Sequence, residues 1–159
     1  MLKPRRPQSG VMLLEVLIAL LIFSLGVLGL VGLQTNAIKQ SGQSKYRTDA
    51  TLLANELLGQ MWVSNRSFAS LSTAFSSATN GASYLTWQAK VANTLPGATT
   101  YPPSVVVTQV APLPDLVGGA PTPSTRTPSS RVTITMRWKA PGEPAADPPH
   151  SFVLINEIR

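Results

Sequence analysis

The chain has 159 residues, of which 43% are hydrophobic and 13% are charged. This charged fraction is about half of the ~25% typical of soluble domains, and the charge is unevenly distributed. The run from Val11 to Leu33 carries one ionisable group and is long enough to cross a bilayer, which argues against an ordinary cytosolic enzyme. The chain contains no cysteine, which excludes disulfides, thiolate nucleophiles, thiolate zinc sites and a lipid anchor on an N-terminal cysteine.

The first ten residues, MLKPRRPQSG, form a short basic leader. Lys3, Arg5 and Arg6 carry its charge, and two prolines disfavour a regular helix. These three residues supply half of the formal net charge of +6. A chain without the leader would therefore give only weak charge-based support for nucleic-acid binding.

An apolar run from Val11 to Leu33 follows the leader. It exceeds the roughly 18 to 20 residues that cross a bilayer, and it predicts a membrane-spanning helix. A cleaved secretory signal is less favoured, because such signals have only about 7 to 15 apolar residues and end in an A-x-A site. Basic residues flank the run on both sides, and the denser group before it favours an N-terminus in the cytoplasm.

Glu15 is the one ionisable residue of this run. A carboxylate within an apolar span costs about 2.5 to 3.5 kcal/mol on insertion scales, so it needs a partner unless it lies near the headgroups. Cleavage between Gly10 and Val11 would create an amino group four residues before Glu15, about 6 Å away along a helix. That ammonium could pair with Glu15 of the same chain or of a neighbouring chain.

The sequence around Gly10 resembles the class III signal of type IV prepilins. The shared features are the basic leader, Gly10, four mostly apolar residues, Glu15 and the stretch VLIALLIFSLGVLGLVGLQ. The resemblance implies that a prepilin peptidase cuts after Gly10 and methylates the amino group of Val11, and that Glu15 sets subunit register. The family more often has Phe or Met at the position of Val11 and Thr or Ser at that of Met12.

From residue 9 to residue 62 the chain is similar to the PilV family of minor type IV pilins. The spacing of Gly26, Gly29 and Gly32 favours this family over the minor pseudopilins of type II secretion, which share the LLEVLIAL opening. The resemblance implies a single-pass inner-membrane protein with a periplasmic head that later joins a pilus on the cell surface. The implied role is to initiate or cap pilus assembly and to support adhesion and twitching motility.

The partners implied by this resemblance are other minor and major pilins, the prepilin peptidase, the inner membrane and an adhesin at the pilus tip. Two alternatives remain open. One is a minor pseudopilin of the type II secretion system. The other is a membrane-tethered periplasmic binding domain that is never processed.

Residues 34–62 continue the apolar run as an amphipathic helix. Its apolar residues recur at steps of three and four and predict one buried face: Tyr46, Ala50, Leu53, Ala54, Leu57 and Met61. The pattern alone also allows a separate helix after a loop at Ser41-Gly42. The pilin resemblance instead implies one helix of about 50 residues.

Four glycines would each weaken such a helix by about 1 kcal/mol relative to alanine, so we expect bending or local melting at Gly26, Gly29, Gly32 and Gly42. The first three recur at every third position. They either allow another helix to approach closely in lipid or only permit flexibility, and the spacing does not decide between the two.

Residues 63–159 predict a periplasmic head. A loop with a short helix is expected to residue 80, and residues 84–95 fit either a strand or a helix ending at Pro96-Gly97. The resemblance implies the helix. Strands are predicted at 105–110, 131–139 and 152–155, the last in a central position because it is apolar throughout. The proline-rich segments 111–123 and 140–149 are expected to be surface loops.

The predicted fold class is α+β and type IV pilin-like. A long N-terminal α-helix, whose apolar half spans the membrane, packs its C-terminal half on a small antiparallel sheet. The apolar stripe of the helix and the inward face of the strands must both be buried, and packing them against each other buries both.

The sequence predicts no enzyme, cofactor or metal site. His150 is the only histidine and is expected to be a solvated loop residue; no paired carboxylates and no phosphate-binding glycine loop appear. Arg131, Arg137 and Lys139 share one predicted strand face, whereas Trp138 points inward. This arrangement favours a solvated charged face over nucleic-acid binding, and an acidic pilin or adhesin is as good a candidate partner as DNA.

Overall fold

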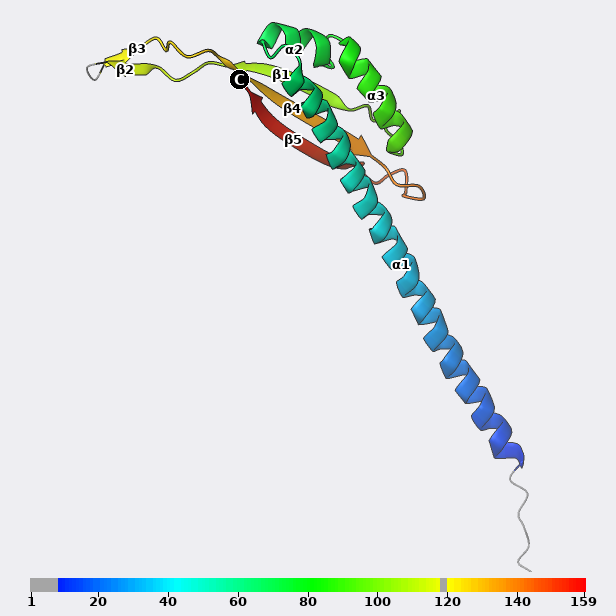
Figure 1. Ribbon diagram of the computed structural model, residues 1–159. Helices are drawn as coiled ribbons and strands as arrows, with labels where there is room; N and C mark the ends of the chain where they lie inside the picture. The colour runs from blue at the N-terminus through cyan, green and yellow to red at the C-terminus, as the bar shows by residue number, and fades with distance from the viewer. Residues whose placement is uncertain (1–8, 118–119) are drawn as a thin grey trace, which may run out of the picture. The chain divides into compact units, whose positions relative to one another are not determined.

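The computed structural model describes residues 9–117 and 120–159 (Figure 1). The elements in chain order are helices α1 (Ser9–Val63), α2 (Phe68–Phe75) and α3 (Ala82–Thr94) and strands β1 (Ser104–Val110), β2 (Asp115–Val117), β3 (Ala120–Thr122), β4 (Ser129–Trp138) and β5 (His150–Ile158). The chain divides after Gly42 into two compact units. We call residues 11–42 the N-terminal segment and residues 43–159 the head, and we describe each by itself.

Helix α1 is continuous over 55 residues, which confirms the prediction of one long helix. The alternative with a loop at Ser41-Gly42 is wrong. The helix also runs unbroken through Gly26, Gly29 and Gly32, so the local melting expected there is absent. Leucine, alanine and glutamine between the glycines favour the helix, and the segment contains no proline that would interrupt it.

The main sheet of the head has three antiparallel strands in the order β1-β4-β5. Its register places Val106, Thr133 and Ile155 side by side on adjacent strands. The prediction that 152–155 forms a central strand is wrong, because β5 lies at an edge. Only two residues of this apolar run, Phe152 and Leu154, face the core. Val153 and Ile155 point to the opposite face and are 51% and 64% exposed.

The proline-rich segment 111–123 is not only loop. It contains β2 and β3, which pair as a small antiparallel ladder and project from the ends of β1 and β4 (Figure 1). Asp115 stabilises the base of this projection, since its carboxylate accepts a hydrogen bond from the Thr125 N–H at 3.1 Å and lies 3.5 Å from Arg126. Segment 140–149 is a loop between β4 and β5, as predicted.

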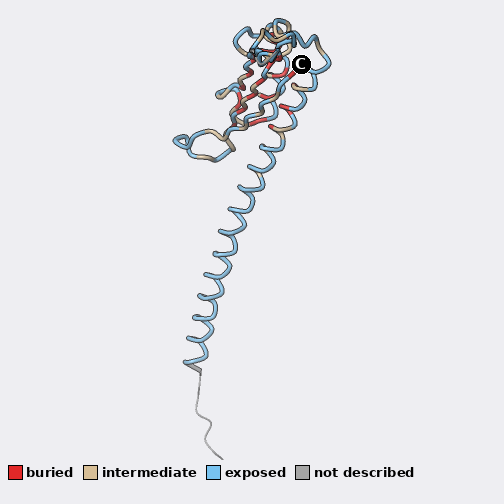
Figure 2. The backbone as a smooth tube through the Cα atoms, turned by 90° about the vertical axis from the view of Figure 1, so that its left-hand side faces the viewer, coloured by how far each residue is buried: buried red, intermediate tan, exposed pale blue. Residues whose placement is uncertain are grey.

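The core of the head lies between the C-terminal part of α1 and the inner face of the sheet (Figure 2). The predicted stripe of α1 is the buried face, with Tyr46 only partly buried at its start. The facing strand residues are fully buried or nearly so: Val105, Val107, Val132, Ile134, Met136 and Trp138. The α+β arrangement is therefore confirmed, and burial of these apolar faces is its main source of stability.

Helix α3 confirms the helical interpretation of residues 84–95 and excludes the strand. Its buried side has a helical spacing and includes Tyr84, Trp87 and Val91. The indole N–H of Trp87 donates to the backbone carbonyl of Leu53 in α1 at 2.9 Å, and the Tyr84 hydroxyl donates to the carbonyl of Pro103 at 2.7 Å. Burial raises the pKa of Tyr84. These two bonds fix α3 between α1 and the start of β1.

Gly81 permits the tight connection between α2 and α3. A Cβ atom at this position would lie 2.2 Å from the backbone oxygen of Ala74, a distance at which backbone must move. Gly59, on the exposed side of α1, has no atom within 4 Å of the same hypothetical Cβ. The structure therefore requires glycine at position 81 but not at position 59.

We expect Leu57→Ala to destabilise the head by about 2 to 5 kcal/mol, because Leu57 is fully buried and its removal leaves a cavity. Leu52→Ala is the matched control in the same helix, since Leu52 is 63% exposed. It should change stability by no more than about 0.5 kcal/mol. Chemical unfolding of the full chain in mild detergent measures both, and equal effects would contradict the packing described above.

We expect Gly81→Ala to destabilise the protein by more than about 1 kcal/mol, because the new methyl group collides with backbone. Gly59→Ala should stabilise it by about 0.5 to 1 kcal/mol, since alanine is the better residue in an exposed helix. Thermal unfolding followed by circular dichroism measures both variants. A neutral Gly81→Ala would show that the α2–α3 connection is looser than the structure indicates.

Candidate functional site

The N-terminal segment is apolar and uncovered. Residues 11–41 are exposed at every position (Figure 2). The helix is long and apolar enough to cross a membrane, with a mean hydropathy of 2.8 in its most apolar window and none of that window buried. Leucine and isoleucine side chains in such numbers do not stay in water, so lipid or another protein must cover this segment.

Gly10 and Val11 lie in the first turn of α1, and Glu15 follows one turn later. Glu15 is exposed, and no basic group in the described part of the chain forms an ion pair with it. Lys3, Arg5 and Arg6, the predicted leader charges, lie outside the described residues. Within the described residues, the carboxylate thus has no partner to neutralise it in an apolar environment.

Gly26, Gly29 and Gly32 leave open space along the N-terminal segment. A Cβ atom at any of the three would meet nothing within 4 Å. Among the residues that the structure describes, no packing contact requires glycine at these positions. Close approach of a second helix and simple flexibility both remain compatible with them.

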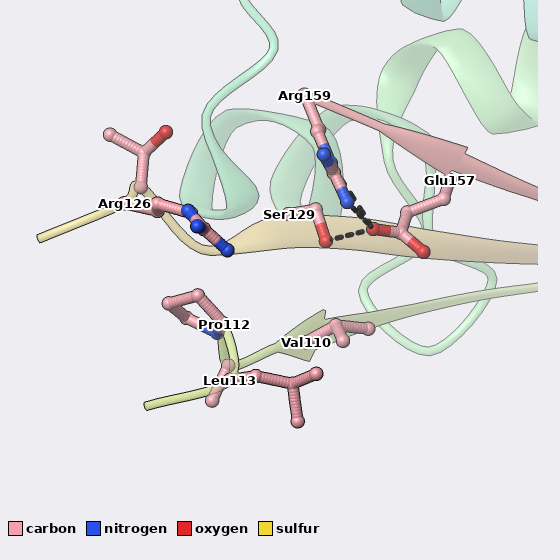
Figure 3. Close-up of a pocket in the computed structure, with 9 residues that line it drawn as sticks. Val110, Pro112, Leu113, Arg126, Ser129, Glu157 and Arg159 are labelled. Carbon is pink, nitrogen blue, oxygen red and sulfur yellow. Dashed lines mark hydrogen bonds and ion pairs between the residues drawn. The ribbon is translucent and has the colours of Figure 1, made fainter. Parts of the chain in front are cut away.

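An open groove of about 510 Å³ lies at the end of the sheet where β1 ends and β4 begins (Figure 3). Its lining combines aliphatic Val110 and Leu113 with Arg126, Glu157 and Arg159. Figure 3 shows Ser129 and Arg159 converging on Glu157, whose carboxylate accepts hydrogen bonds from both. The bond from Ser129 is the main reason that the pKa of Glu157 lies below its ordinary value.

The groove offers little free charge to a ligand. Arg159 lies 3.3 Å from the carboxylate of Glu157, and Arg126 lies 3.5 Å from that of Asp115. Both guanidinium groups are thus already near carboxylates of the same chain. We assign no ligand to this groove.

Glu143 organises a polar cluster at the opposite end of the sheet, in the loop between β4 and β5. One carboxylate oxygen lies 2.8 Å from the His150 Nε2 and accepts from the Gln43 side chain of α1 at 3.3 Å. The other oxygen accepts from the Ala140 N–H at 3.1 Å. The hydrogen bond with His150 is the largest cause that holds the pKa of Glu143 below its ordinary value, and burial opposes it.

The expectation that His150 is a loop residue is wrong, although its side chain remains 37% exposed. It is the first residue of β5, and its ring stacks on Trp138 with the ring centroids 5.9 Å apart. The two residues are register partners on β4 and β5, which brings the rings together. The proline pair before His150 indicated a loop, but the strand begins immediately after it.

The predicted basic face has two members rather than three. Arg131 and Arg137 are exposed on β4, whereas the Lys139 ammonium donates to the carbonyls of Ala145 and Asp147 at 2.9 Å each. Lys139 thus fastens the loop instead of facing a partner. Trp138 is 3% exposed and points inward, as predicted, so it cannot stack on a nucleic-acid base.

Across residues 9–117 and 120–159 there is no cluster of three or more histidine, aspartate or glutamate side chains that could hold a metal ion. Comparison of the chain with known protein families, with curated proteins and with solved structures finds no match. Arguments about function therefore rest on the residues and their geometry.

Sequence reasoning missed the cluster around Glu143 and the groove at Glu157. Gln43 and Glu143 are 100 positions apart in sequence, and no local pattern marks their contact. The one available signal was local: Glu143 is one of two acids in a proline-rich loop that ends at the only histidine of the chain. The groove depends on the end of β1, the start of β4 and the end of β5 lying together, which only the sheet register determines.

We expect the Glu143 cluster to make the stability of the head sensitive to acid. Because folding lowers the pKa of Glu143, its contribution is present above the ordinary value of 4.5 and disappears as the pH falls through the folded value. Wild type should therefore lose more stability than Glu143→Gln when the pH is lowered from 7 to about 3. Asp147→Asn, in the same loop, is the control and should follow wild type. Chemical unfolding across this pH range measures the difference, and parallel curves for wild type and Glu143→Gln would contradict it.

Proposed function

We propose that the protein is a minor type IV pilin of the PilV family that helps to initiate or cap pilus assembly and supports adhesion and twitching motility. One observation carries the proposal. The exposed apolar part of α1, residues 11–41, bears one carboxylate, Glu15, which lies five residues after Gly10 and has no ion-pair partner among the described residues, and the same helix continues into a folded α+β head.

The N-terminal segment suits a subunit that exchanges one apolar environment for another. In the inner membrane, lipid covers residues 11–33, and the head lies in the periplasm. In a filament, the same side chains pack against the helices of other subunits. Since both environments exclude water, the transfer does not require the helix to unfold or the head to rearrange.

Glu15 favours the transfer into the filament and sets the register of the subunit there. Cleavage after Gly10 frees the amino group of Val11, which lies about 6 Å from Glu15 along a helix. Pairing of this ammonium with Glu15, within a chain or between adjacent subunits, removes the penalty of two unpaired charges in an apolar environment. Prepilin peptidase is thus the first partner, and other minor and major pilins and a tip adhesin follow.

A minor pseudopilin of type II secretion is the principal alternative, because the same N-terminal features serve that system. Deletion of the gene separates the two. Loss of surface pili with intact secretion of exoproteins supports the pilus, and the reverse supports type II secretion.

We expect the mature wild-type chain to begin at Val11 and to carry a methyl group on its amino terminus. Gly10→Val should block cleavage, because a branched side chain replaces the hydrogen beside the scissile bond, and the variant should be absent from sheared pili. Mass spectrometry of the membrane and pilus fractions measures both. A wild-type chain that still begins at Met1 would remove every pilin interpretation and favour the unprocessed, membrane-tethered binding domain.

Glu15→Gln completes this experiment. The variant should be cleaved like wild type but should enter pili poorly, because the new ammonium lacks its carboxylate. Glu56→Gln is the matched control, since Glu56 lies on the same helix but is exposed in the head, where it pairs with Lys90. Equal incorporation of the Glu15 and Glu56 variants would count against the register role of Glu15.

A further inference from the structure

The two edges of the main sheet differ in how they are covered. At β1, the connection between α2 and α3 lies on the edge: the Ser77 N–H donates to the Val105 carbonyl at 3.0 Å, and the Val105 N–H donates to the Ser77 hydroxyl at 3.2 Å. At β5, no backbone group outside β4 hydrogen-bonds to the strand among the described residues. The backbone donors and acceptors on the outer side of β5 are therefore free for another strand.

Strand β5 lacks the features that usually prevent edge strands from pairing. It is nine residues long, its sequence HSFVLINEI contains no proline and no lysine, and four successive residues in it are apolar. Even the side chains that face the core, Phe152 and Leu154, are only partly buried, because the sheet ends at this strand. Long apolar edges of this kind pair with other strands.

We propose that β5 is an interaction surface that pairs antiparallel with β5 of a second copy of this chain, which joins the two main sheets into one sheet of six strands. Centring the pair on Leu154 uses all nine residues. Val153 then lies opposite Ile155 of the second copy, and Ser151 lies opposite Glu157. Directly opposite residues lie on the same face of a sheet. This register therefore places the exposed aliphatic side chains of the two copies beside each other on one face, and the half-buried side chains beside each other on the other face.

Charge complementarity favours a second copy as the occupant. Within one chain, Arg137 is the register partner of Ser151, and Arg131 is the register partner of Glu157. In the pair, Glu157 therefore lies opposite Ser151 of the second copy, with that copy's Arg137 one strand further. The Glu157 carboxylate already accepts hydrogen bonds from Ser129 and Arg159 of its own chain, so Arg137 of the second copy is an additional cation beside it and not its first partner. At ~4.8 Å per strand the separation is about 10 Å between backbones, which arginine and glutamate side chains can bridge. The two-fold symmetry creates this contact twice and sets no like charges opposite each other in the β5 pair.

This inference is independent of the proposed function, and introduced cysteines test it, because the natural chain contains none. The full chain is purified in mild detergent as Val153→Cys and as Ile155→Cys. On mild oxidation, a mixture of the two should form disulfide-linked dimers between one chain of each kind, since these positions lie opposite each other. Each variant alone should form far fewer, because its cysteines are offset by two residues along the strands. No linkage in the mixture, or equal linkage in all three samples, overturns the proposal.

Ile155→Lys provides a second measurement. It should weaken dimerisation by roughly tenfold or more in sedimentation equilibrium, because each dimer loses two aliphatic contacts at its centre. Val106→Lys is the matched control, since Val106 lies in the same row of the same face but on β1, away from the edge. Circular dichroism verifies that both variants fold. Unchanged dimerisation of folded Ile155→Lys, or an equal effect of Val106→Lys, would show that β5 is not the interface.

Discussion

Contact between one stripe of α1 and the inner face of the sheet holds the head together. The stripe runs from Ala50 to Met61 and meets Val132, Ile134 and Met136 of the central strand in one buried cluster. A chain without cysteine has no covalent link to support a head of this size, so apolar burial has to supply most of its stability. Helix α3 adds to this core through Trp87, whose indole N–H reaches the backbone of α1.

One helix therefore has two different surroundings. In the head, apolar residues occupy one face of α1 and polar residues the other, as in any helix that covers a sheet. In the N-terminal segment, apolar residues surround the helix on all sides, and every residue from 11 to 41 is exposed. A helix of the second kind needs lipid or other helices around it. This difference along a single helix underlies the proposal of a subunit that moves from a membrane into a filament.

The polar contacts of the head are concentrated where strands end. Glu143 connects the β4–β5 loop to α1 and to β5, Lys139 fastens the same loop, and Asp115 and Glu157 serve the other end of the sheet. These side chains hold loops that contain many prolines and few backbone hydrogen bonds. Strand β5 has such contacts only at its ends, and its middle remains available to a second strand.

Local residue patterns determined the long helix, its buried stripe, the inward alternation of β4 and the position of Glu15 four residues after Val11. Each depends on spacing within a few turns or a few strand residues, where the geometry of the backbone alone assigns the face. Tertiary structure decided that β5 lies at an edge, that residues 115–117 pair with residues 120–122 as a ladder, and that Glu143 contacts Gln43 and His150. These depend on which distant segments meet, and an apolar run such as 152–155 has the same composition whether one strand or two lie beside it.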